Sequence, residues 1–336
     1  MNERRTGVPD DPVAPPEREA VTGAAEPAPR RKRRRGRGEQ LMVPDAEFQS
    51  YYGKPILNGP TWAATDIAGY LFLGGLAGGS SVLAAGAHLT GRPRLAHGLK
   101  IGAVGAISAS VAALVHDLGK PSRFVNMLRV LKPSSPMSVG SWLLSVYGPA
   151  AGVAAISEVT GRLPRLGSAA TVAAAATGPA VAAYTAVLIS DTAVPAWHEG
   201  HVEMPYLFVG SASLAAGGLG MLVAPVREAG PARRAVGLGA AVELGAEELM
   251  RQRMGLPGET LRNGKAGRLI RTARVLGLFA ATAALTKADD SRPLSMVAGA
   301  AALAGSACMR FGLFDAGVQS TRDPKYVVVP QKESNH

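Results

Sequence analysis

The stretch YLFLGGLAGGSSVLAAG, Tyr70–Gly86, decides the fold. Its seventeen residues carry no charge, and they lie in an apolar segment, Ala63–Leu89, that is long enough to cross a membrane as a helix. Its glycines, alanines and serines favour close contact between neighbouring helices. The part GGLAGGS, Gly74–Ser80, falls in mid-helix, where close packing explains it better than a phosphate-binding loop does. The stretch therefore predicts a membrane helix packed through small residues.

Further apolar segments follow it along the chain. Six are clear predictions of membrane spans: Leu99–Leu118, Val139–Val159, Ala169–Ser190, Pro205–Ala224, Arg268–Thr286 and Leu294–Phe314. A weaker one, Ala232–Met250, contains Glu243, Glu247 and Glu248. It either spans with its glutamates facing inward or lies at the interface, and spanning is favoured. The sequence predicts an all-α, polytopic membrane bundle of about eight transmembrane helices, and no strand pattern competes.

The two ends of the chain differ from this apolar middle. Residues 1–40, rich in Pro, Glu and Arg, predict a disordered basic tail, and residues 41–61 predict an interfacial lead-in to the bundle at 62–314. Residues 315–336 predict a polar C-terminal tail. Of a net charge of +11, seven positive residues lie in Arg30–Arg37. Beside so apolar a chain, this run indicates contact with membrane lipid and a cytoplasmic N-terminus rather than nucleic acid.

The second span ends in LVHDLGKPSRF, Leu114–Phe124, where Gly119 and Pro121 are expected to stop the helix. Ionisable groups at the edge of an apolar helix are costly and often mark a functional site. This polar cluster contains His116, Asp117, Lys120 and Arg123.

With eight spans, most unusual polar residues meet at the membrane face where the second span ends. Among them are Asp66, Tyr70, Tyr184, Asp191, His198, His201, Glu243 and Arg310. An ordinary explanation stays open, because polar side chains crowd helix ends and long ones reach toward water.

Redox cofactors held by the chain are not expected. The single cysteine, Cys308, excludes an iron–sulfur cluster ligated by this chain alone. His88 and His116 end successive helices on opposite membrane faces, so they cannot share a haem iron. No metal site is predicted.

A quinone needs an apolar slot, hydrogen-bond partners for its carbonyls and a proton route. Asp117 beside His116 is the predicted proton relay, and Tyr184 and His201 are predicted to hydrogen-bond a carbonyl. Alternatively, Asp117 forms an ion pair with Arg123 that fixes the loop, and the two roles are compatible.

Five motifs resemble the NrfD/PsrC family of integral membrane subunits. They lie at Trp62–Gly79, His116–Phe124 (HDLGKPSRF), Ser135–Leu144 (SPMSVGSWLL), Tyr184–Ser190 (YTAVLIS) and Arg310–Pro324. The resemblance identifies Asp117 with the motif aspartate, Tyr184 with the fourth-helix tyrosine and Arg310 with the arginine before the AG motif. The family usually has a tryptophan where this chain has Val139.

The resemblance implies an eight-helix bundle that exchanges electrons with the quinone pool, menaquinone or ubiquinone. It also implies two partners, an iron–sulfur ferredoxin-like subunit and a molybdopterin oxidoreductase subunit, with the quinone pocket at the face where the iron–sulfur subunit docks. Asp117 and His116 are then the catalytic candidates, and Tyr184, Arg123, Arg310 and His201 the quinone-binding ones. The chain is expected to be a quinone-reactive membrane anchor of a respiratory oxidoreductase, inert as an oxidoreductase alone. The alternatives are a transporter, for which paired interrupted helices would be the signature, and a purely structural anchor.

Overall fold

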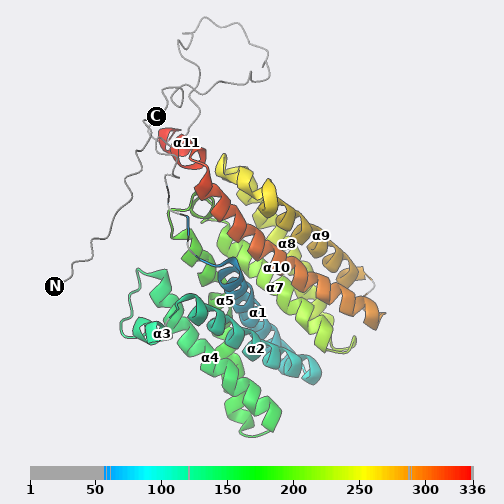
Figure 1. Cartoon of the computed structure of the whole chain (residues 1–336). Coiled ribbons are helices and arrows are strands. Elements are labelled where there is room, and N and C mark those ends of the chain that lie inside the picture. The colour runs from blue at the N-terminus through cyan, green and yellow to red at the C-terminus, as the bar shows by residue number, and fades with distance from the viewer. Residues whose placement is uncertain are drawn as a thin grey trace, which may run out of the picture. The chain divides into compact units, whose positions relative to one another are not determined.

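The computed structural model describes residues 57, 59–60, 62–119, 122–286, 288 and 290–333 (Figure 1). The predicted basic tail at 1–40 and most of the predicted lead-in at 41–61 lie outside these residues, and nothing tests those two predictions.

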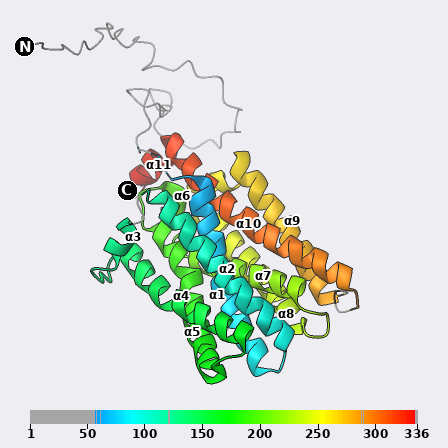
Figure 2. The same ribbon diagram turned by 60° about the horizontal axis from the view of Figure 1, so that its bottom comes forward.

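Long helices that run up and down make up the described part of the chain (Figures 1 and 2). The eight long helices are α1 (Ala64–Leu89), α2 (Pro93–Asp117), α4 (Pro136–Thr160), α5 (Pro164–Ser190), α7 (Met204–Val223), α8 (Gly230–Arg253), α9 (Gly264–Thr286) and α10 (Arg292–Arg322). The shorter ones are α3 (Ser122–Met127), α6 (Pro195–Glu199), the 3₁₀ helix η2 (Pro257–Leu261) and α11 (Lys325–Glu333). No strand occurs among the described residues, so the all-α prediction is confirmed.

The helix boundaries follow from local chemistry. Pro93, Pro136 and Pro164 stand in the first turn of their helices, where a missing N–H costs no hydrogen bond. The Ser135 hydroxyl accepts a hydrogen bond from the Ser138 N–H and so caps the start of α4. α4 ends at Gly161, whose φ of 67° is a left-handed conformation that glycine adopts without strain.

Helix α1 lies at the centre of the bundle, in contact with α2, α5, α7 and α10. Its glycines make this position possible. A Cβ atom on Gly78 would overlap the backbone of Gly178 in α5, and one on Gly79 would come within 2.6 Å of the Ala212 carbonyl oxygen in α7. The small residues of α1 therefore serve close helix packing, as its sequence predicts.

Seven of the described helices are long and apolar enough to cross a membrane, and α8 is the long helix left out. It nevertheless packs along α7 in antiparallel register. Gly210 lies against Glu243, Leu214 against Gly239, and Gly217 against Ala232. Because these contacts follow α7 through most of its length, α8 belongs to the bundle rather than lying flat on its surface.

Helix α10 extends farther than the sequence predicts. Its predicted span ends at Phe314, but the helix continues to Arg322, so the predicted boundary of the tail falls inside α10. Against α7 it runs antiparallel: Gly299 meets Gly218, and Arg310 meets Phe208. By this register α10 passes the first residue of α7 near residue 314 and continues beyond it.

Candidate functional site

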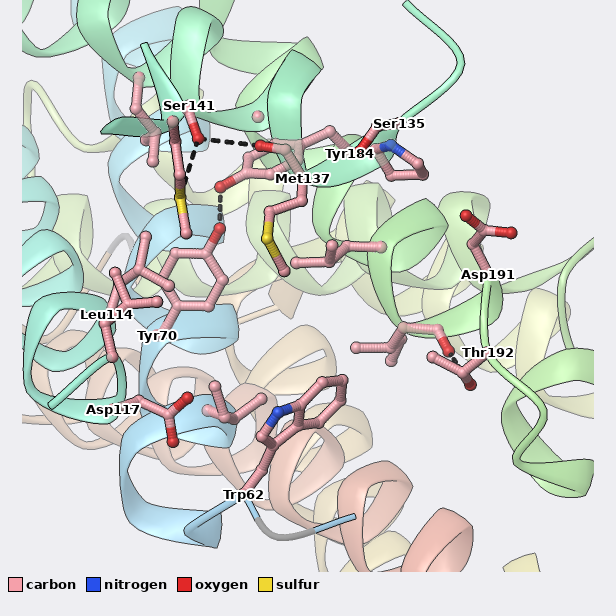
Figure 3. A pocket seen from close by; sticks show the side chains of 18 residues that line it. Trp62, Tyr70, Leu114, Asp117, Ser135, Met137, Ser141, Tyr184, Asp191 and Thr192 are labelled. Atoms are coloured by element: carbon pink, nitrogen blue, oxygen red, sulfur yellow. Dashed lines mark hydrogen bonds between the residues drawn. The ribbon is translucent and has the colours of Figure 1, made fainter. Parts of the chain in front are cut away.

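A cavity of about 370 Å³ lies among α1, α2, α4 and α5, at the end of the bundle where α2 and α5 terminate (Figure 3). Its volume is within the range of small-molecule sites. The walls are mainly apolar. The polar or aromatic lining residues are Trp62, Tyr70, Asp117, Ser135, Ser141, Tyr184, Asp191 and Thr192. An apolar slot with few polar groups suits a ligand that is hydrophobic with a small number of hydrogen-bonding atoms.

The hydroxyls of Tyr70 and Tyr184 form a hydrogen bond with each other at the wall of this cavity (Figure 3). Tyr70, on α1, is 2 % exposed, and Tyr184 reaches it from α5. Gly140 of α4 makes room for Tyr184, because a Cβ at that position would overlap the tyrosine ring. The glycine of the SPMSVGSW motif thus positions the tyrosine of the YTAVLIS motif.

Asp117 is the last residue of α2 and lines the same cavity. The chain turns directly after it: Gly119 has a φ of 69°, and its N–H donates to the His116 carbonyl over 3.0 Å. In Figure 3 Asp117 and Asp191 lie at opposite edges of the cavity, with the two tyrosines at a third. The structure therefore brings Asp117 and Tyr184 to one cavity, as the sequence places them.

The two other predicted residues of the LVHDLGKPSRF segment do not line the cavity. His116 Nδ1 lies 2.8 Å from Oδ2 of Asp66 at the start of α1, and the His116 side chain is largely exposed. Arg123 donates to the Leu118 carbonyl over 3.0 Å. The alternative ion pair between Asp117 and Arg123 is not formed, and Asp117 has no ion-pair partner among the described residues. Arg123 instead stabilises the turn after α2 through its hydrogen bond to the Leu118 carbonyl.

A second hollow, of about 580 Å³, adjoins the first and shares Pro136, Tyr184 and Asp191 with it. His198 and His201 line its outer side, and Nδ1 of His201 lies 2.8 Å from the His198 carbonyl oxygen. His201 is thus near Tyr184 but outside the inner cavity.

The segment that carries His201 is held by Glu203, directly before α7. Both oxygens of Glu203 accept hydrogen bonds from Arg253 at the end of α8, over 2.6 and 2.8 Å. These hydrogen bonds, together with the positive charge of Arg253, lower the pKa of the Glu203 carboxyl from its ordinary value. The ion pair therefore ties the end of α8 to the loop beside the hollow.

Trp197, in α6, closes the bundle beside the cavity. It is 1 % exposed, and its Nε1–H donates to the Leu313 carbonyl of α10 over 2.9 Å. Trp62, which lines the cavity, stacks on it with ring centroids 5.9 Å apart. The two tryptophans connect the cavity wall to α10.

Arg310 is buried elsewhere. It lies on α10 with its guanidinium 3.5 Å from the centre of the Phe208 ring, and its Nη2 donates to the Phe208 carbonyl over 2.7 Å. His88 lies at the opposite end of the bundle from the cavity, where Nε2 is 3.1 Å from the Ser168 hydroxyl. The predicted quinone-contacting role of Arg310 has no support from its position.

Sequence reasoning did not assign Tyr70, Ser141, Met127 and Met137 to the site, although all line the cavity. Tyr70 lies one turn after Asp66 at the start of α1. This position at the same membrane face as Asp117 is the sequence signal that points to Tyr70 as a site residue. Ser141 lies in the SPMSVGSW motif, and its hydroxyl donates to the Met137 carbonyl over 2.9 Å. Within the described residues, no three His, Cys, Asp or Glu side chains gather as a metal site.

The fold and the cavity define a multi-pass helical membrane protein with a polar-edged pocket at one end of an apolar bundle. Residues 57–236, more than half of the chain, match the family described as polysulphide reductase, NrfD. The chain therefore belongs to the NrfD family, whose members are integral membrane subunits that typically anchor respiratory oxidoreductases. No curated protein matches the chain as a relative.

Proposed function

We propose that the cavity binds a quinone or quinol, menaquinone or ubiquinone, as an exchangeable substrate. The chain is then the quinone-reactive membrane anchor of a respiratory oxidoreductase complex. One observation carries this proposal: the hydrogen-bonded hydroxyls of Tyr70 and Tyr184 and the carboxyl of Asp117 line a single, otherwise apolar cavity. Family membership supports it, because the NrfD family is a quinol-reactive one.

Each lining residue has a role that follows from its chemistry. A quinone, when bound, supplies two-electron, two-proton chemistry. Tyr184 donates a hydrogen bond to a quinone oxygen, while Tyr70, the more buried of the pair, holds the Tyr184 hydroxyl in place. Asp117 holds a proton at its carboxyl oxygen and exchanges it with water at the half-exposed end of α2.

His116, Arg123, His201 and Arg310 take secondary parts in this proposal. His116 pairs with Asp66 beside Asp117, and Arg123 fixes the turn after α2. His201 lines the outer hollow together with Asp191, and its part in the proposal is to exchange protons between that hollow and solvent. Arg310, which is away from the cavity, contributes through the packing of α10.

The hydrophobic substrate has an apolar route to the cavity along α4. Val139, Trp142 and Val146 form one exposed apolar face of α4, while Met137, which is 48 % exposed, lines the cavity from the other side of that helix. Val139 also lines the outer hollow, where the usual tryptophan of the family would take more space. A lipid-dissolved substrate therefore reaches the cavity from the membrane rather than from water.

The partners in this proposal are an iron–sulfur ferredoxin-like subunit and a molybdopterin oxidoreductase subunit. They dock at the membrane face on which the cavity lies, because electrons must pass between an iron–sulfur cluster and the bound quinone. The support is the family, whose members associate with subunits of oxidoreductase complexes.

Replacement of Asp117 by asparagine in the intact complex tests the proposal. We expect Asp117→Asn to abolish quinone-linked turnover while the complex still assembles, since asparagine keeps the shape but cannot carry a proton. The matched control is Asp315→Asn at the same end of the bundle, where Asp315 pairs with Lys265 and does not line the cavity. Unchanged quinone-linked turnover in Asp117→Asn would refute the relay, and an assembled complex that binds no quinone would indicate a purely structural anchor.

A further inference from the structure

A second polar cluster lies inside the other half of the bundle, among α7, α8 and α10. Glu243 and Arg310 are each 1 % exposed. Ser211 and Ser306 join them, with their hydroxyl oxygens 2.8 Å apart, and the Ser306 hydroxyl also lies 3.0 Å from the Ser211 carbonyl oxygen. None of the four lines the cavity described above, so this cluster is a separate feature of the molecule.

Three atoms of the cluster have no hydrogen-bond partner within the described part of the chain. They are Oε2 of Glu243, and Nε and Nη1 of Arg310. Charged atoms that are buried and unpartnered are strongly disfavoured, which is why such atoms in native proteins are met by ordered water. Donors on Arg310 and an acceptor on Glu243 are the groups that hold internal water.

The cluster lies well inside the apolar bundle. Glu243 precedes the end of α8 at Arg253 by ten residues, which is about 15 Å along a helix. The hydrocarbon core is about 30 Å thick. Glu243 also packs against Gly210, six residues inside α7, a helix long and apolar enough to span. Glu243 therefore lies within the apolar bundle, where an ionisable group is costly and usually functional, rather than at its edge.

A chain of charged groups connects Glu243 with the outside. Glu247, one turn later on α8, is also 1 % exposed, and its carboxylate accepts hydrogen bonds from Arg274 of α9 over 2.7 and 3.2 Å. Arg274 also lies 3.8 Å from Glu248, whose side chain is half exposed. The sequence from Glu243 to Glu248 thus passes from the bundle interior to its outer surface.

Few other charges act on Glu243. Helix α10 presents Arg310, α9 presents Arg274 by way of Glu247, and α7 presents only the Ser211 hydroxyl. Arg310 is therefore the fixed charge that balances a Glu243 carboxylate in the interior.

We propose that Glu243 is an internal proton-binding site, hydrated together with Arg310 and linked to the outer surface of α8 and α9 through Glu247. Protonation forms one O–H bond at the Glu243 carboxylate with a proton from hydronium in the bulk solvent, relayed by water that enters beside Glu247 and is left as water; release returns the proton to solvent by the reverse steps. This inference goes beyond the quinone site and does not depend on it.

Infrared difference spectroscopy of the full chain in detergent, recorded as the pH is changed, tests this proposal. We expect a carboxylic acid C=O band that appears on acidification, shifts in D₂O, and is lost in Glu243→Gln. The matched control is Glu158→Gln, which removes a glutamate paired with Lys100 near the end of the bundle opposite the cavity, and it should retain the band. The infrared experiment contains no quinone and no partner subunit. A negative result therefore contradicts the Glu243 proposal alone, and loss of the quinone proposal would not affect the infrared result.

A second pair of variants covers the case in which Glu243→Gln does not fold. Glu243→Asp keeps a carboxyl at a shorter reach and should change the frequency of the same band. Glu247→Gln should slow deuterium exchange into it, because it removes the link to the surface. The proposal is overturned if the band survives in Glu243→Gln, if Glu243→Asp leaves its frequency unchanged, or if exchange is equally fast in Glu247→Gln.

Discussion

The Tyr184 hydroxyl has two neighbours in the proposed complex, the Tyr70 hydroxyl and a quinone oxygen. Tyr184→Phe removes it and leaves the buried Tyr70 hydroxyl without its partner. The net loss of one hydrogen bond is about 1 kcal/mol. We therefore expect the affinity for a quinone analogue to fall about fivefold, measured by equilibrium binding to the purified chain.

The control for this experiment is Tyr206→Phe. Tyr206 lies on α7, is 67 % exposed and is not a cavity residue. Equal affinities in the Tyr184 and Tyr206 variants would mean that the hydroxyl does not contact the ligand.

The Glu203–Arg253 pair gives a prediction about pH. Because the pKa of Glu203 is lowered in the folded protein, the pair stabilises the fold above the ordinary glutamate pKa of 4.5 and loses this contribution as the pH falls through the lowered value. Arg253 is 37 % exposed on its side chain, so solvent reduces the effect to about 1–2 kcal/mol.

Thermal unfolding in detergent at several pH values checks this prediction. Glu203→Gln should unfold at a lower temperature than the parent near pH 7, and the difference should shrink toward pH 3. A difference that stays constant across this range would show that the carboxylate charge is not what Arg253 stabilises.

For single residues, the sequence predicts which membrane face a side chain lies at, but not whether that side chain points into the cavity. Asp117 ends α2 and Tyr184 lies within two turns of the end of α5, so the alternation of spans already places both at one membrane face. Helix rotation was not predictable, so His116, adjacent to Asp117 in sequence, was assigned to the site although it pairs with Asp66 outside the cavity.

Between elements, the closest contacts depend on glycine. A Cβ atom on Gly218 of α7 would lie 2.6 Å from the Gly299 carbonyl oxygen of α10. Gly218→Ala must therefore push the two backbones apart, and we expect it to destabilise the fold by about 1–3 kcal/mol. A thermal unfolding curve in detergent measures the loss.

The comparison variant is Gly105→Ala in α2, where no atom lies within 4 Å of the added methyl group. It should be neutral or slightly stabilising, since alanine favours a helix. If both variants behave alike, the small residues of α7 do not set the distance between helices.

Helix positions were predictable because hydrophobic length is a strong signal, and the seven apolar spans appear where the sequence places them. The exact ends of the helices were not predictable, because a helix that packs against another part of the protein can continue past the end of its apolar segment. α10 continues to Arg322 where Ser320 and Leu313 contact α6. In α8, buried glutamates with arginine partners occupy positions that apolar residues would otherwise fill. The mean hydropathy of α8 is therefore too low to predict that it packs inside the bundle.

For the whole molecule, the register of α7 and α8 predicts a testable topology. Arg227, between α7 and α8, and Asn263, directly before α9, are both exposed. If α8 crosses the membrane, single cysteines at these positions, in a Cys308→Ser background, should react with an impermeant maleimide from opposite sides. Labelling from one side would place α8 at the interface. The same experiment in sealed vesicles tests the predicted cytoplasmic N-terminus.

The 31 residues of α10 amount to a rod of about 46 Å, against about 30 Å of hydrocarbon. Its first residue, Arg292, is tied to the carbonyls that end α7, so the excess length stands entirely at the other end. There the last turns of α10 extend past the first residue of α7 and pack against α6 beside the pocket. The partner subunit proposed above would contact these turns when it docks at this end of the bundle.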